Sequence, residues 1–195
     1  MKHLLGILII VASITFMNCE GRRTQSQALS KSIEKFKKTV NFETNVYIPK
    51  TYIEQETDTL LSNGYHVKIK TYTDTSNAVH FSKIKDTINY QTYYRNFKFD
   101  ISVSKDNKLI YHERFDKKKV NKAFNYSTNL VSGSELYNFD TLAVLKSINV
   151  NDDPTYTNMV LIDITYAIPE SDRYASHTLF IDEKGKSNIV QIEVK

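Results

Sequence analysis

The residues of this chain that could do acid–base or metal chemistry are scattered rather than grouped. Zinc sites usually show ligand pairs at tight local spacing, and the histidines show none. His112 and Glu113 are adjacent, but neighbours on a strand point to opposite faces. We therefore interpret His112 as a hydrogen-bonded structural residue opposite Ile101 on a half-buried face, and we expect no metal and no cofactor. The histidines beyond the N-terminal segment are His66, His80, His112 and His177.

Motifs that bind phosphate or activate a nucleophile are absent from the sequence. There is no P-loop, no Gly-rich dinucleotide loop, no G-x-S-x-G elbow and no H-E-x-x-H helix. Asp152-Asp153-Pro154 supplies two carboxylates, whereas a calcium site needs six or more oxygens, so we interpret it as a turn. We predict that the protein is not an enzyme. The remaining catalytic hypothesis is a hydrolase in which two histidines converge with a carboxylate.

Tyrosine is the one compositional excess, with 13 Tyr and 10 Phe but no Trp. Tyr90, Tyr93 and Tyr94 cluster before a predicted strand, where exposed rings could stack on sugars or contact a protein. The alternative is that tyrosine, a good strand former, lies at the rim of a sheet. This cluster is the candidate binding site.

The N-terminus has the features of an export signal. An uncharged run from Leu4 to Met17 follows Met1-Lys2-His3. As a helix it would span roughly 21 Å, less than the ~30 Å hydrocarbon core of a bilayer. We predict a signal peptide over residues 1–18. Cys19, the single cysteine, follows directly, so no intramolecular disulfide can form.

Phe16-Met17-Asn18-Cys19 resembles a relaxed bacterial lipoprotein signal, and the Asn-, Thr-, Tyr- and Lys-rich body resembles small Bacteroidetes-type lipoproteins without an assigned activity. The resemblance implies that Cys19 is lipidated, with palmitate among its acyl chains, and that it anchors the chain to the outer membrane. Surface-exported lipoproteins of this group carry acidic residues after the cysteine. Here Gly21 and two arginines follow Glu20, which implies a periplasm-facing protein. The alternatives are the cell surface, or secretion after a cut behind Gly21.

Charge and composition exclude some classes of protein. The 195 residues are 41% hydrophobic and 25% charged, which is typical of a globular chain. The net charge is +4, and the densest basic run, Lys117 to Lys119, is interpreted as the solvated face of a short helix. We expect no nucleic-acid partner. Residues 19–30 are predicted to be a polar lipidated tether, and residues 31–195 a single strand-rich globular domain.

The body alternates with a period of two, which indicates strands. Residues 30–40 are predicted to form an amphipathic helix, either near the membrane or packed on the domain. Asn63-Gly64 predicts a two-residue hairpin that pairs Leu60 with Val67 and Asp58 with Ile69. Asp106-Asn107 predicts a second hairpin, and Asp116 is expected to cap a helix to Phe124. Further strands are expected at 97–103, 109–114, 159–168, 178–182 and 188–194, with a helix at 139–148.

Strands joined by short turns, with one or two short helices, indicate an α+β fold built mainly from antiparallel sheet. An all-β sandwich-like or open barrel-like fold is the alternative. The functional hypothesis is a non-catalytic cell-envelope lipoprotein that acts as a binding or adaptor module for an envelope protein partner. The alternative is a lipoprotein that binds a small apolar or glycan ligand in a cavity lined by the face from Phe97 to Val103.

Overall fold

The computed structural model describes residues 24–39, 42–85, 88–127 and 131–195. The predicted signal peptide, Cys19 and the first part of the predicted tether lie outside the described residues. Contacts divide the chain into two units, Met1–Glu43 with Ile84–Asn89, and Thr44–Lys83 with Tyr90–Lys195. Both sheets described below belong mainly to the second unit.

In the first unit, helix α2 spans Gln25–Thr39, so it begins five residues before the predicted start. Thr24 Oγ1 accepts a hydrogen bond from the Gln27 backbone, and Gln27 Oε1 accepts one from the Thr24 backbone. This reciprocal pair is a capping box, and it makes the end of the predicted tether helical. Leu29, Ile33 and Phe36, which share one helix face, are all exposed.

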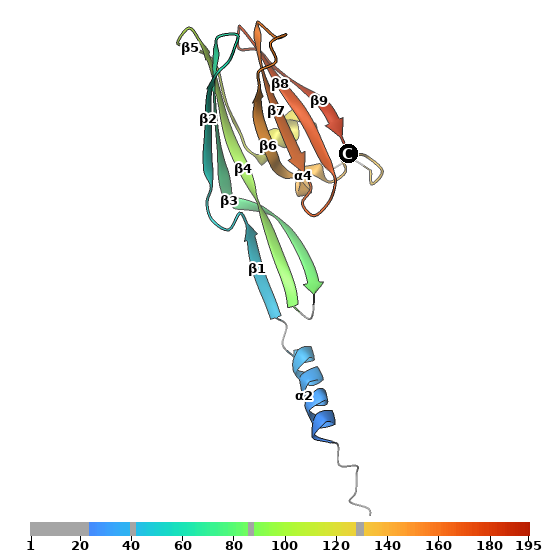
Figure 1. The fold of residues 1–195 in the computed structure, drawn as a ribbon. Coiled ribbons are helices and arrows are strands. Elements are labelled where there is room, and N and C mark those ends of the chain that lie inside the picture. Colours follow the sequence, from blue (N-terminus) through green and yellow to red (C-terminus); the bar gives the residue numbers. More distant parts are fainter. Residues whose placement is uncertain (1–23, 40–41, 86–87, 128–130) are drawn as a thin grey trace, which may run out of the picture. The chain divides into compact units, whose positions relative to one another are not determined.

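Five strands form the first antiparallel sheet (Figure 1). Their order is β1-β4-β3-β2, and β5 pairs with β4 as well, so that β2 is a terminal strand. The strands are β1 (Phe42–Ile48), β2 (Glu54–Leu60), β3 (Tyr65–Lys85), β4 (Ile88–Lys105) and β5 (Lys108–Phe115).

Four strands form the second sheet in the order β6-β7-β8-β9, each antiparallel to the next, so that β6 and β9 are terminal. They are β6 (Val144–Asn151), β7 (Met159–Ala167), β8 (Tyr174–Asp182) and β9 (Ser187–Val194). The predicted strands at 159–168, 178–182 and 188–194 are confirmed. The fold is therefore α+β with mainly antiparallel sheet, as predicted.

The prediction of a helix over 139–148 is wrong for most of its length. Helix α4 covers only Phe139–Leu142, and β6 begins at Val144. A β-bulge between Leu145 and Ser147 places both Leu145 and Ile148 against the core, although they are three positions apart. In a strand with a bulge, this spacing imitates the face of a helix.

The core fills the space between the two sheets. Phe99, Ile101 and Val103 from β4 are fully buried, as are Ile162 and Ile164 from β7. Alternation of apolar and polar residues predicted both strands, because one face of each strand meets the core. Helix α3 (Lys117–Ala123) buries Val120, and Asp116 caps it by accepting a hydrogen bond from the Lys119 backbone at 2.8 Å, as predicted.

The predicted register of the β2–β3 hairpin is wrong by one residue. Leu60 pairs with His66, and Asp58 pairs with Lys68. The loop has three residues rather than two, since the Leu61 backbone N–H donates to Tyr65 O and Gly64 has a φ of +83°. A glycine in this left-handed conformation is typical of three-residue hairpin loops. The shift moves Asp58 to the outer face of the sheet.

His112 is also displaced from its predicted position. A bulge between Val103 and Ser104 shifts the β4–β5 register, so that His112 pairs with Ser102 and not with Ile101. The side chain is exposed, and Ser102 Oγ lies 2.9 Å from His112 Nδ1. The Asp106-Asn107 turn itself is as predicted, with both residues at positive φ.

Candidate functional site

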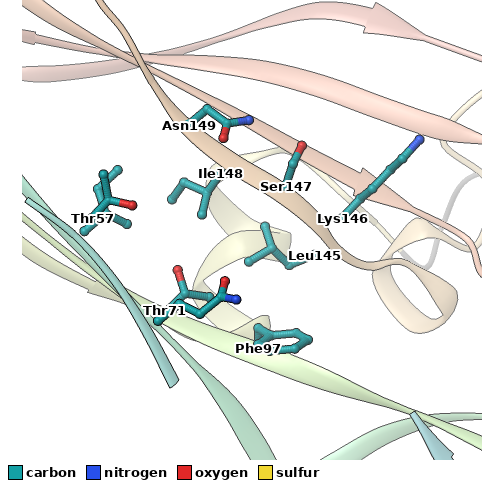
Figure 2. A pocket seen from close by; sticks show the side chains of 10 residues that line it. Thr57, Thr71, Phe97, Leu145, Lys146, Ser147, Ile148 and Asn149 are labelled. Atoms are coloured by element: carbon teal, nitrogen blue, oxygen red, sulfur yellow. The ribbon is translucent and has the colours of Figure 1, made fainter. Parts of the chain in front are cut away.

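A groove lies between the two sheets on the side where β2 and β6 are terminal strands (Figure 2). We call it the inter-sheet groove, and its volume is about 290 Å³. Its lining residues come from four strands, so each sheet contributes one wall. They are Gln55 and Thr57 of β2, Ile69 and Thr71 of β3, Phe97 of β4, and Leu145 to Asn149 of β6.

Apolar side chains form the floor of the groove. Ile69 and Leu145 are buried, and Phe97 and Ile148 are half-buried against the core. Figure 2 shows Leu145 and Ile148 on the side of β6 that faces Phe97. The floor is therefore a continuation of the core surface that neither sheet covers.

The wall formed by β2 is polar, because this strand has polar residues on both of its faces. On the outer face, Glu54 pairs with Lys70 and Glu56 pairs with Lys68, both at 2.7 Å. The intervening residues Gln55 and Thr57 face the groove and are exposed.

Closing the sheets at this wall would bury an amide and a hydroxyl against an apolar floor. Each would lose its hydrogen bonds to water, at a cost of about 1–3 kcal/mol. The opening is therefore dictated by the residue types of β2 and is not a local packing defect.

The groove touches β6 in a different way. Five consecutive residues, Leu145 to Asn149, line it. Successive side chains of a strand point to opposite faces, so a cavity that only met one face would contact alternate residues. Residues that point to either face of β6 line the cavity, and β6 is a terminal strand, so the cavity lies along its free edge. Lys146 and Ser147 accordingly point away from the floor in Figure 2.

Hydrogen bonds between two loops fix one end of the groove. Ser62, just beyond β2, donates from its hydroxyl to Asp152 Oδ1 at 2.8 Å, and Asp152 lies just beyond β6. Asn63 Nδ2 donates to the backbone oxygens of Tyr156 and Met159, each at 2.9 Å. The walls are thus joined where the two terminal strands end, which holds the width of the groove at that point. Asp152-Asp153-Pro154 belongs to this connection, as the predicted turn.

Among the described residues that line the groove, Lys146 alone carries a charge. Its Nζ lies 5.5 Å from the centre of the Tyr174 ring. The other polar lining groups are amides and hydroxyls, with no carboxylate or histidine in the described lining. This arrangement supplies hydrogen bonds, apolar contact and one positive charge.

The predicted tyrosine cluster lies within β4 and does not form one surface. The Tyr93 ring stacks on Tyr47 of β1 at 4.9 Å and on His80 of β3 at 4.8 Å, between rings from the strands on either side. Tyr94 packs edge-on against Phe81 and donates to Glu170 at 3.1 Å. Tyr90 is half-buried. Cross-strand packing of this kind agrees with the alternative that these tyrosines are present because they form strands well.

The four histidines have separate surroundings. His66 contacts Asp58, His80 contacts Gln91, and His112 contacts Ser102. His177 is buried against Phe124. In the part of the chain that the structure describes, no group of three or more His, Cys, Asp or Glu could hold a metal ion.

Sequence reasoning did not single out Gln55, Thr57 or the residues of β6. A usable signal was present, because Gln55 and Thr57 alternate with acidic residues in a strand that has no apolar face. Such a strand cannot cover a core on either side.

None of the described helices is both long and apolar enough to cross a bilayer. Comparison of the chain with protein-family models and with curated proteins gives no match. The inter-sheet groove is therefore the candidate site on the strength of its geometry.

Proposed function

We propose that this protein is a non-catalytic, lipid-anchored binding module of the outer membrane that faces the periplasm and holds a protein partner in the inter-sheet groove. One observation carries the proposal: a polar wall, Gln55 and Thr57, stands opposite an apolar floor beside an unpaired strand edge. Binding sites commonly combine an apolar surface with a few placed polar groups.

The location rests on the lipoprotein-like signal that ends at Cys19. Helix α2 supports it, because Leu29 and Ile33 are exposed on one face while Lys31 and Lys35 lie close to them in sequence. An apolar stripe beside basic residues suits the headgroup region of a bilayer. A helix at this point in the chain would follow an acylated Cys19 closely.

The second candidate function is a small-ligand carrier, and the structure favours it less. Pockets that enclose a small organic ligand typically measure about 300–1,000 Å³, and the groove holds about 290 Å³ in an open channel. The expected cavity face is mostly occupied, since Phe99, Ile101 and Val103 are fully buried in the core and Phe97 alone reaches the groove. An open channel of this size suits a segment of a larger partner.

The test is native mass spectrometry of the acylated protein, purified in mild detergent from its own envelope. Thr57→Arg fills the groove from an exposed position, and Ile148→Glu places a charge on its floor. The matched control is Ile192→Glu on β9, the far terminal strand of the same sheet, where the side chain is 61% exposed.

We expect a stoichiometric protein companion with the wild type and with Ile192→Glu, and its loss with Thr57→Arg and Ile148→Glu. A companion that survives both groove variants would place the binding site elsewhere. A small adduct that survives desalting and disappears with the groove variants would instead establish the ligand carrier.

A further inference from the structure

We propose that the occupant of the inter-sheet groove is an extended peptide segment of the partner, which pairs with the edge of β6 as an additional strand. This inference rests on the proposed function and specifies its ligand. Strand addition at a free sheet edge uses main-chain hydrogen bonds for affinity and alternate side-chain contacts for selectivity.

The position of the groove along the strand edge is the main argument. The cavity runs along five consecutive residues of β6, Leu145 to Asn149, and β6 is a terminal strand, so a ligand in the cavity lies beside an unpaired strand edge. On β2 the cavity touches alternate residues, Gln55 and Thr57, and so meets an inner face rather than an edge. A strand bound here would therefore pair with β6 and present one face to β2.

The length of the exposed edge sets the length of the segment. Five residues of extended chain span roughly 17 Å. The bulge between Leu145 and Ser147 ends the regular pairing at one side, and the Ser62–Asp152 hydrogen bonds close the groove just beyond β6 at the other. The regular edge between these two points runs from Ser147 to Asn151, so about five residues of a passing chain can pair with it in register.

The lining predicts the composition of the segment. Inward-facing side chains would meet Ile69, Phe97 and Ile148 and should be apolar, with Gln55 and Thr57 available for a hydroxyl. Outward-facing side chains would lie on the polar outer surface of the second sheet, where Asn151 Nδ2 donates to Asp163. Lys146 takes no part in these contacts, because its Nζ lies over the ring of Tyr174 on β8, away from the free edge of β6.

A neutral glycan is the competing occupant, since amides and hydroxyls also bind sugars. Sugar sites usually offer the exposed face of an aromatic ring. Among the described lining residues the one aromatic ring is that of Phe97, which is half-buried against the core and so offers a sugar little surface for stacking. A glycan also cannot form the regular main-chain ladder that the free edge of β6 offers to another strand. The strand is therefore the better match.

The experiment selects ligands for the full acylated protein in detergent from a phage-displayed library of random nine-residue peptides. The tightest peptide is then synthesised with a methyl group on each backbone nitrogen in turn. Because neighbouring N–H groups of a strand point in opposite directions, methylation should weaken binding tenfold or more at every second position and little in between. Amide hydrogen exchange should slow in β6 and stay unchanged in β9.

The variants link this test to the proposed function. Thr57→Arg should abolish peptide binding, and Ile192→Glu should leave it unchanged. Losses without a two-residue period, or no protection in β6, would overturn strand pairing. If no peptide is selected, or if a neutral oligosaccharide or a second copy of this chain fills the groove, strand pairing by a partner is likewise refuted. The proposed function would survive those results if the native protein companion still depends on Thr57 and Ile148.

Discussion

His177 offers a quantitative test of how burial controls the acid stability of this protein. The side chain is 2% exposed on β8, stacks on Phe124 at a centroid distance of 4.3 Å and contacts the ring of Tyr126. Neither ring nitrogen has a hydrogen-bond partner among the described residues. Burial lowers the pKa of His177 to about 4 from an ordinary 6.5; the Ala175 backbone offsets this in part, although its geometry falls short of a hydrogen bond.

The size of the effect follows from the difference in proton binding between the two states. Below pH 6.5 the unfolded chain protonates His177 while the folded chain does not, so protons favour unfolding. The folded state therefore loses stability as the pH falls from 6.5 to about 4. The loss amounts to about 2 kcal/mol by pH 5 and about 3 kcal/mol by pH 4.

The assay is urea unfolding at pH 7.5 and pH 5.0 for the wild type, His177→Phe and His112→Phe. Phenylalanine keeps the stacking and removes two buried nitrogens, so His177→Phe should match the wild type within about 1 kcal/mol at pH 7.5. It should then lose about 2 kcal/mol less than the wild type at pH 5.0. His112→Phe makes the same substitution at an exposed histidine and serves as the control.

The titration of carboxylates does not affect the comparison between the wild type and His177→Phe. Hydrogen bonds from Asn77 and Ser76 outweigh burial and hold the pKa of Asp74 at about 2, so its contribution is lost only as the pH falls from 3.8. The other carboxylates are common to the wild type and His177→Phe, so their contributions cancel in the difference between these two proteins. An equal loss for the wild type and His177→Phe would refute the reasoning from burial.

Three further predictions concern folding stability, each measured by urea or thermal unfolding. Gly185→Ala should cost more than about 2 kcal/mol, because φ is +75° and the added carbon would meet Ile110 O at 2.0 Å; Gly64→Ala, with φ +83° in open space, should cost about 1 kcal/mol. Lys117→Met should cost about 2 kcal/mol, since Nζ donates to two backbone carbonyls at α4, and an unchanged midpoint would contradict this. Asn107→Gly should stabilise the Asp106-Asn107 turn by about 0.5 kcal/mol, because both positions have positive φ; a loss would argue against that turn geometry.

Strands with a strict two-residue period were predictable from the sequence. Ile162, Ile164 and Tyr166 in β7, and Phe99 and Ile101 in β4, alternate with polar residues, and each of these five is buried. The turn at Asp106-Asn107 was predictable too, because both of its positions need residues that tolerate positive φ. These features depend only on residues that are close in sequence, and together they are enough to predict the fold class.

Bulges account for most of the errors. The bulge at Leu145 makes a strand look like a helix, and the one at Val103 moves His112 to the outer face. The extra residue in the β2–β3 loop shifts Asp58 in the same way. Inserting one residue costs little locally but reverses every side chain beyond it, so periodicity cannot locate it.

The inter-sheet groove was harder to predict from the sequence than the strands and their register. Its two walls come from β2 and β6, which belong to different sheets. Whether these two strands lie opposite each other depends on how the sheets pack together. The tyrosines drew attention by composition, yet the ring of Tyr93 is covered by its cross-strand neighbours. A site made of threonine, glutamine and isoleucine carries no distinctive residue type. What identifies it is the unpaired edge beside it.

The hydrogen bond between Ser62 and Asp152 has a consequence for the order of folding. The two residues are 90 positions apart, whereas nearly every strand pairs with its neighbour in sequence. Hairpins close in roughly 1–10 μs, but contacts between distant residues wait until the entropy of a long loop has been lost. Each sheet is therefore expected to form first, and their docking at this contact to come last. The groove does not exist before that step, so a newly made chain offers no groove to the proposed partner until folding is complete.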